Sequence, residues 1–343
     1  MSITTSPPPE YNVTGQDYKQ RGHLRFGGPI IDIHAHVMLT RPGDPPSGPP
    51  LGTGPDASSD QAATMLEVAS DFGIVQTYSM CLPADIPILR ARFGSKLEFN
   101  GSIIKKKIDD PDDDAYRLLD EFLKQGVKII KFWGAPRGRE RGLLLDTPWR
   151  IESARRALAA GVRVFMVHCA DPDVWFQNVY ADATKFGTKP DQYRHLQNLL
   201  ERFPEATWIA AHMGGDPEHP DHLEELLVKY PHLRIDTSAT KWQVREVSPR
   251  RQAIRDLICR HPGRFLFGVD LVTRHQLTRE HYVRRYWCQR TLWEGNGQGR
   301  SPIADPDYKP REGEPATPLL HGVDMPDEVL QKVYHDNALA LFR

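Results

Sequence analysis

The chain has 343 residues, and its 44 lysine and arginine residues nearly balance 45 aspartate and glutamate residues, giving a formal net charge of −1. This balance excludes charge-driven binding to nucleic acid or to an anionic membrane as the main function. Hydrophobic residues make up 39% and charged residues 26%, as in ordinary soluble globular proteins. No apolar run approaches the roughly 20 residues that a membrane span requires.

The N-terminal segment 1–28 has no basic stretch followed by an apolar core, so it does not read as a secretory signal. Its composition predicts a loose arm that lies over the body or over a partner subunit, and a homodimer is therefore one option. The cysteines Cys81, Cys169, Cys259 and Cys288 are scattered without close pairing, which predicts neither a disulfide framework nor a zinc ribbon. We expect a cytoplasmic protein.

From residue 29 onward, eight short β-branched runs alternate with helical patterns. They are 30–38, 74–82, 97–104, 127–133, 162–169, 207–213, 233–238 and 265–271. Mostly continuous apolar runs of this length are typical of parallel strands covered on both faces. Eight strands, each followed by a helix, predict an α/β (β/α)8 TIM barrel over residues 29–343. A doubly wound open sheet has the same alternation and is the alternative.

Two segments depart from this repeat, and both follow the end of a predicted strand. Segment 41–55 is rich in proline and glycine, and segment 272–323 is far longer than a barrel loop needs to be. Segment 272–323 carries several aromatic residues between 281 and 293, which an exposed linker would not normally keep. We expect part of it to be a lid or interface insertion at the mouth of the barrel, with a disordered tract as the alternative.

Histidines and one aspartate lie at the ends of the predicted strands. His34 and His36 are two residues apart on the first strand, so their rings share a face and form a natural chelate for a divalent metal. His168, His212 and Asp270 end the fifth, sixth and eighth strands. Each residue alone is more often a hydrogen-bonded structural residue, but in a barrel these strand ends converge on one mouth, where catalytic residues gather.

The motifs IDIHAH, VFMVHCADPD, IAAHMGGD and FGVD occur in this order. With them the sequence resembles the amidohydrolase superfamily, in particular the amidohydrolase-related branch that contains aminocarboxymuconate-semialdehyde decarboxylase. The resemblance implies that His34, His36, His168 and Asp270 are metal ligands and that His212 works on bound water or substrate. It implies one divalent ion per chain, for which ligand chemistry favours zinc, with manganese or iron(II) as alternatives.

Lys131 and Trp133 lie on the fourth predicted strand and share a face by alternation. Binuclear relatives carry a carboxylated lysine near the position of Lys131. Because the branch resembled here usually manages with one metal, we interpret Lys131 as a non-ligand and Trp133 as a substrate-binding wall. Carboxylation of Lys131 and a second metal stay open.

Other candidates are weaker. Asp32 is expected on the inward face with His34, as a buried hydrogen-bond acceptor, and Cys169 should point away from His168. His219 and His222 have a metal-like spacing, but the intervening proline favours a solvated helix start. The arginines at 137, 139 and 141 follow the fourth strand, where a solvated loop is a stronger interpretation than attraction of an anionic substrate.

Three functions fit this constellation. The first is metal-dependent hydrolysis of a small-molecule amide, lactone or ester, in which Asp270 takes a proton from metal-activated water and His212 polarises the group under attack. The second is non-oxidative decarboxylation of an unsaturated or aromatic carboxylic acid at the same site. The third, a metal-binding scaffold without catalysis, is disfavoured because the metal does not need His212.

Overall fold

The strands follow one another around a barrel. The computed structural model describes residues 17–39, 60–104, 114–274, 277–310, 312–314 and 317–342. The strands are β1 Ile30–His36, β2 Ile74–Met80, β3 Leu97–Ile103, β4 Ile129–Trp133, β5 Val164–His168, β6 Thr207–Ala210, β7 Leu233–Asp236, β8 Phe265–Leu266, β9 Leu271–Val272, β10 Gln298–Arg300 and β11 Leu319–His321. The α-helices are α1 Gln61–Asp71, α2 Ile86–Phe93, α3 Ala115–Lys124, α4 Pro148–Ala159, α5 Asp173–Asn178, α6 Ala183–Phe186, α7 Lys189–Arg202, α8 Pro220–Lys229, α9 Thr240–Val247, α10 Arg251–Arg260, α11 Arg279–Glu294, α12 Asp327–Gln331 and α13 Asn337–Ala340.

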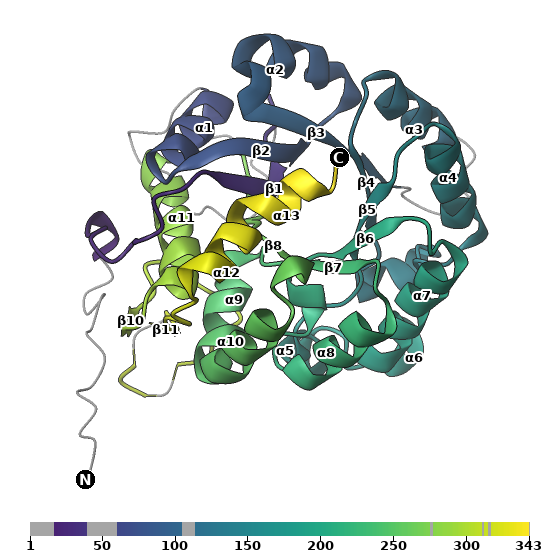
Figure 1. Cartoon of the computed structure of the whole chain (residues 1–343). Helices are drawn as coiled ribbons and strands as arrows, with labels where there is room; N and C mark the ends of the chain where they lie inside the picture. The colour runs from purple at the N-terminus through teal and green to yellow at the C-terminus, as the bar shows by residue number, and fades with distance from the viewer. Residues whose placement is uncertain are drawn as a thin grey trace.

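All strands from β1 to β9 belong to one parallel sheet in the order β8-β7-β6-β5-β4-β3-β2-β1-β9. The predicted eighth strand is present as two short pieces: β8 pairs with β7, and β9 pairs with β1. The ring is therefore closed through residues 265–272, and the helices surround it (Figure 1). The predicted TIM barrel is confirmed.

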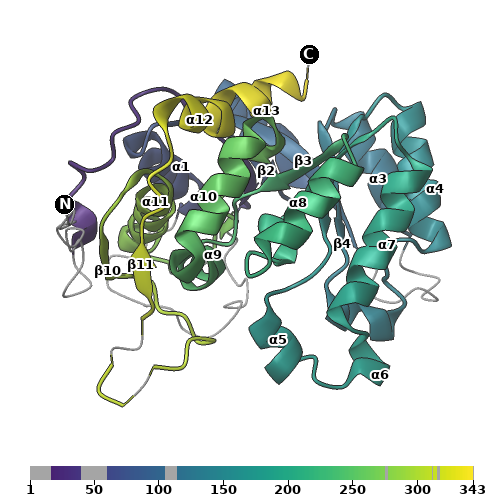
Figure 2. The same ribbon diagram turned by 60° about the horizontal axis from the view of Figure 1, so that its bottom comes forward.

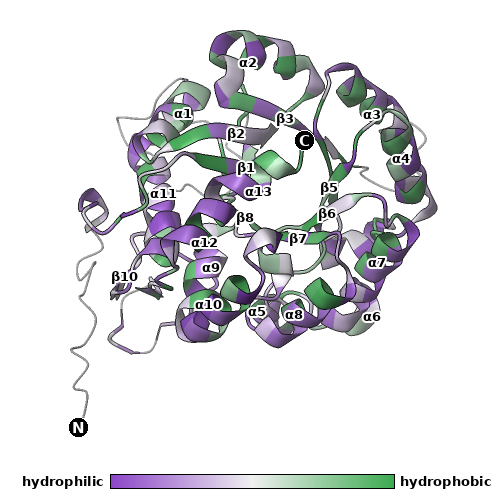
Figure 3. Cartoon of the chain, in the orientation of Figure 1, coloured by the Kyte–Doolittle hydropathy of each residue, from purple (hydrophilic) through white to green (hydrophobic). Residues whose placement is uncertain are grey.

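The hydrophobic pattern of the chain explains this arrangement. Apolar residues line the strands and the helix faces that pack on them, while hydrophilic residues gather on the outside (Figure 3). Inside the barrel, side chains from several strands form a smaller cluster that includes Ile33, Ile129, Met166, Ile209 and Leu266. A filled interior of this kind makes the barrel a packed core rather than a pore.

The two ends of the barrel differ. Helices α12 and α13 cross the end where the strands begin, and Phe342 stacks on Tyr78 with ring centroids 5.1 Å apart (Figures 1 and 2). The opposite end carries α5, α6 and the segment after β10 (Figure 2). Because the strands are parallel, their carboxyl ends all open toward this second end.

Two helices begin at capping residues of the kind that favours a helix start. Asp114 caps α3 by accepting the N–H groups of Tyr116 and Arg117, and Thr147 precedes Pro148 at the start of α4. Segment 41–55 and residues 1–16 of the arm lie outside the described residues. None of the described helices is both long enough and apolar enough to cross a membrane.

Much of the predicted lid is part of the barrel wall. Helix α11 packs against α1 and α9, and its Tyr282, Tyr286 and Trp287 are fully buried. The Gln289 amide reaches the carbonyls of Thr237 and Gly268, which ties the helix to the barrel strands. The aromatic residues of this segment thus belong to a core helix, and a lid or interface role stays a prediction for the other parts of segment 272–323.

Candidate metal centre

A β-bulge in the first strand sets the position of the first histidine. The pairing of β1 with β2 gains one residue between Asp32 and Ala35. As a result, both Ile33 and His34 turn inward, and Asp32 does not share the face of His34. The expectation from simple alternation is wrong at Asp32. Its Oδ1 accepts the backbone N–H groups of His34 at 3.0 Å and of Val269 at 3.2 Å, so the expected role as a buried acceptor is confirmed.

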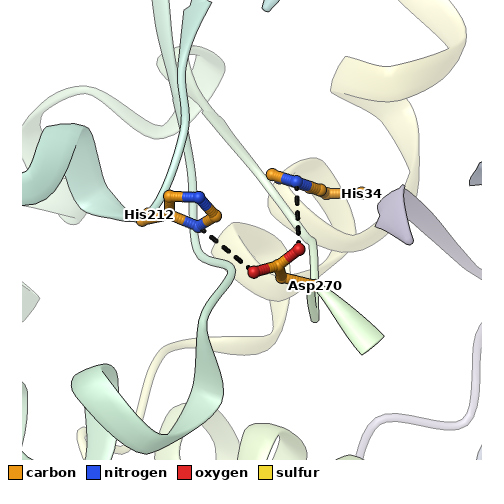
Figure 4. A group of neighbouring side chains, drawn as sticks. All are labelled: His34, His212 and Asp270. Carbon is orange, nitrogen blue, oxygen red and sulfur yellow. Dashed lines mark ion pairs between the residues drawn. The ribbon is translucent and has the colours of Figure 1, made fainter. Parts of the chain in front are cut away.

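Three of the predicted residues converge on Asp270. Its Oδ1 lies 3.3 Å from His34 Nε2 and 3.2 Å from His36 Nε2, and its Oδ2 lies 4.0 Å from His212 Nδ1. Figure 4 shows the His34 and His212 rings on either side of the carboxylate. One ligand atom from each of His34, His212 and Asp270 falls within 4.8 Å of the others.

This donor set fits a divalent ion. Zinc binds imidazole nitrogens and carboxylate oxygens at about 2.0–2.2 Å, which places neighbouring tetrahedral ligands about 3.3 Å apart. The two distances from Asp270 to the histidines of β1 match this spacing. The site therefore has the chemistry and the geometry of a divalent-metal centre.

The protonation states also suit a cation. Burial lowers the pKa of His36 to about 4 and holds the pKa of His212 well below its usual range, so both rings are neutral at pH 7. Burial alone would raise the pKa of Asp270, but the adjacent His34, His36 and His212 hold it well below the usual range. Neutral imidazoles beside an ionised carboxylate are the forms that bind metal.

Asp236 and Ser238, at the end of β7, support the centre and were missed at the sequence level. Asp236 Oδ2 is 2.8 Å from His34 Nδ1, and its Oδ1 accepts the backbone N–H of His212 at 2.8 Å. Ser238 Oγ lies 2.8 Å from His212 Nδ1. These contacts fix both rings, and hydrogen bonding of His34 Nδ1 leaves Nε2 as its metal-facing nitrogen. The only signal in the sequence was the polar ending of the apolar run LRIDTS.

The backbone at the centre is strained. His212 has a φ of 61° and Asp270 a φ of 59°, both in the left-handed region that is rare for residues with side chains. Such a conformation costs about 1–3 kcal/mol and persists where surrounding contacts fix it. At Asp270 it also explains why the eighth strand is split, because the chain leaves the extended conformation there.

His168 lies beside this group, and its Nε2 has a different partner. Its ring centroid is 4.7 Å from that of His212, while its Nε2 is 2.7 Å from Asp171 Oδ1. The Tyr180 hydroxyl donates to the other oxygen of Asp171 at 2.6 Å. His168 is therefore oriented by Asp171, and its Nδ1 is the nitrogen left for a ligand role.

Lys131, which we predicted to be a non-ligand, lies in direct contact with one of the candidate metal ligands. Its Nζ is 2.6 Å from His34 Nε2, and the side chain is almost fully buried. Burial lowers the pKa of its ammonium group, which eases loss of the proton. Lys131 contacts His34 and Trp133 contacts His168, so both side chains face the centre, as their predicted shared face requires. The contact with His34 places the amine where it competes with a metal for His34 or joins the ligands.

The weaker candidates lie outside the centre. The Cys169 thiol donates to the Gly214 carbonyl at 3.2 Å, away from the metal ligands. His219 precedes α8 with its side chain 52% exposed, as expected for a solvated helix start. His219, Asp173 and Asp216 form a second group with metal-like spacing. The Lys189 ammonium already lies 2.7 Å and 2.6 Å from these two carboxylates and supplies the positive charge there.

Replacement of Asp236 by asparagine should weaken metal binding about 10–100-fold, because asparagine has no charge and only one acceptor oxygen for the two contacts that Asp236 makes with His34 and His212. Competition with a chromogenic chelator measures the affinity. Asp256→Asn, on the exposed surface of α10, is the matched control and should bind metal like the wild type. Equal affinity of both variants would show that Asp236 does not support the ligands.

Comparisons with known proteins agree with the fold. A family model described as "Amidohydrolase" matches residues 31–343, whereas no curated protein matches the chain. Similar solved structures include an uncharacterised TIM-barrel protein from Bordetella bronchiseptica, with TM-score 0.52, 16% identity and coverage of 91% of this chain and 98% of that chain. Another is 2,6-dihydroxybenzoate decarboxylase in complex with 2,6-dihydroxybenzoate, with TM-score 0.55, 14% identity and coverage of 92% and 98%. A third is 5-carboxyvanillate decarboxylase from Novosphingobium aromaticivorans in complex with manganese and a nitrobenzoic acid, with TM-score 0.51, 12% identity and coverage of 98% and 99%. At these identities the likeness is one of fold.

Proposed function

We propose that this chain, which belongs to the amidohydrolase family, is a metal-dependent decarboxylase of an aromatic carboxylic acid. The observation that carries the proposal is an aromatic wall beside the metal centre. Trp133 lies edge-on to His168 at 6.5 Å between centroids, and Trp242 lies 5.6 Å from His212 and 6.2 Å from His168. Trp175 continues the wall at 5.5 Å from Trp242. Indole surfaces of this kind suit a planar ring.

The names of two similar structures support the same class, since both are decarboxylases of substituted benzoic acids. His34, His36, His168 and Asp270 would hold the ion. The ligand chemistry favours zinc, and the manganese in one of those structures makes manganese the alternative. A bound divalent ion would act as a Lewis acid toward the substrate carboxylate.

The residues of the chain supply the remaining functions. The tryptophan wall holds the ring of the acid, with Trp133 in the substrate-binding role, and excludes water from it. As the bond from the ring to the carboxyl carbon breaks, carbon dioxide leaves and the electron pair stays on the ring carbon. His212 would relay a proton from a water molecule to that carbon to form the new C–H bond, and the hydroxide left behind returns to the solvent. Ser238, hydrogen-bonded to His212 Nδ1, keeps that ring in place.

Hydrolysis of an amide, lactone or ester is the second candidate, and the position of Asp270 between His36 and His212 favours it. A carboxylate there can accept a proton from water that a bound divalent ion would activate. His212 would then polarise the carbonyl or protonate the leaving group. The same ligands serve both reactions, so an assay must separate them.

A substrate panel with matched aromatic acids, lactones and amides tests the proposal. We expect release of carbon dioxide from at least one aromatic acid, and loss of that activity on chelation with recovery when zinc or manganese is restored. Turnover of a lactone or an amide without decarboxylation would replace the proposal with the second candidate. Elemental analysis should find about one ion per chain, and a content near two would make Lys131 a carboxylated ligand.

A further inference from the structure

Two arginines lie on the aromatic wall at its outer side. Both belong to the short 3-10 helix Pro136–Arg141, which follows β4 directly. The Arg137 guanidinium lies 5.2 Å from the ring centroid of Trp175, and the Arg141 guanidinium lies 5.7 Å from that of Trp133. Arg141 thus continues the wall beyond Trp133, which lies beside His168, and Arg137 continues it beyond Trp175 and Trp242, which lead from His212.

The Arg137 side chain is exposed, and within the part of the chain that the structure describes no ion pair is found for it. Besides Trp175, its guanidinium contacts the hydroxyl of Tyr180, whose own proton goes to Asp171. The nearby Asp307 accepts the indole N–H of Trp175 at 3.0 Å and is balanced by Lys241 and Arg245, each at 3.7 Å. The carboxylate nearest to Arg137 through these contacts, that of Asp171, lies one hydrogen bond away behind Tyr180 and is shared with His168, so the guanidinium itself can still take an anionic ligand.

We propose that Arg137 binds a second anionic group of the substrate, so that the preferred substrate is an aromatic acid with two carboxylates. This inference rests on the proposed function, since it assigns the first carboxylate to the metal. A guanidinium has five N–H donors, so Arg137 keeps donors for a ligand besides the one that contacts Tyr180. Those donors form a fork that matches the two oxygens of a carboxylate.

Contacts along the wall also help to fix the position of Arg137. Trp175 contacts the Arg137 guanidinium and donates its indole N–H to Asp307. Asp307 lies in the segment after β10, so the insertion fixes the wall on which Arg137 rests. The wall runs from His212 to Trp242 to Trp175 to Arg137 through contacts of 5.6, 5.5 and 5.2 Å, so the proposal places the acid along it, with its first carboxylate at the metal centre and its second toward Arg137.

Calorimetric titration with benzoate and with benzene-1,3-dicarboxylate tests the inference without any need for turnover. We expect the dicarboxylate to bind the wild-type protein, with its metal, about tenfold or more tightly than benzoate, as a charge-assisted bidentate contact allows. Arg137→Gln should remove this difference and leave the affinity for benzoate within about twofold. Arg137→Lys, which keeps the charge but not the fork, should recover only part of the difference.

Arg139→Gln is the matched control, because Arg139 lies on the same short helix but points toward Gly187 and Asp191. It should bind both ligands like the wild type. Equal affinities for the two acids in the wild type, or equal losses in the Arg137 and Arg139 variants, would overturn the inference. If Arg137 discriminates between the ligands but no acid is decarboxylated, the inference stands and the proposed function fails. If a monocarboxylic acid is decarboxylated without discrimination, only the inference fails.

Discussion

Replacing His34 by alanine is expected to remove the metal and to reduce turnover to background. His34 is fully buried, its Nε2 faces Asp270, and its Nδ1 is held by Asp236. Loss of a ligand should weaken metal binding by more than the roughly 10–100-fold that loss of a supporting group costs. Elemental analysis after gel filtration measures the metal content. Turnover is measured with the substrate that the panel identifies.

A second variant separates the loss of a ligand from a folding defect. An alanine at the buried position 34 leaves a cavity, whereas the side chain of His36 is 25% exposed and its loss disturbs the packing less. His36→Ala should therefore keep the thermal stability of the metal-free wild type and still lose the metal. Full metal content in both variants would exclude β1 as the source of the ligands.

The barrel could be predicted because its strands carry a strong local signal. The eight β-branched runs are mostly buried, and seven appear as single strands close to their predicted ranges, as at β5 and β6, while the eighth appears as two short pieces. The ends of these strands locate the site, because a closed parallel barrel brings all carboxyl ends to one mouth. His34, His36, His212 and Asp270 meet for this reason.

Features that depend on pairing between strands were not predictable from single runs. The bulge in β1 inserts one residue relative to β2 and reverses the face of Asp32. Asp236 and Ser238 acquire their role only when β7 is placed beside His34 and His212. Similarly, the aromatic residues of α11 signal burial, and burial in a barrel helix has the same sequence pattern as burial under a lid.

The role of His212 is the assignment on which the proposed chemistry depends most. The family resemblance makes it a group that acts on water or substrate, yet one of its ring nitrogens falls within the same 4.8 Å group as His34 and Asp270. Its Nδ1 is 2.8 Å from Ser238 Oγ, and hydrogen bonding there leaves Nε2 as the nitrogen that can act on a ligand. The contact of the ring with Asp270 is 4.0 Å, against 3.2–3.3 Å for the β1 histidines, and metal analysis of a His212 variant decides between a ligand and an acid–base group.

Replacing His212 by asparagine should therefore lower kcat about a hundredfold or more, the usual contribution of a positioned acid–base group, while the metal content stays near that of the wild type. Asparagine keeps a polar atom near Ser238 and also tolerates the left-handed backbone found at this position, so folding should survive. Elemental analysis and steady-state kinetics on the same preparation make the comparison with His34→Ala direct. If His212→Asn loses metal as completely as His34→Ala, His212 is a ligand, and the proton must come from another group. If it keeps both metal and activity, the His212–Asp270 pair has no part in the proton transfer. Only the combination of retained metal and lost turnover agrees with a histidine that acts on the substrate.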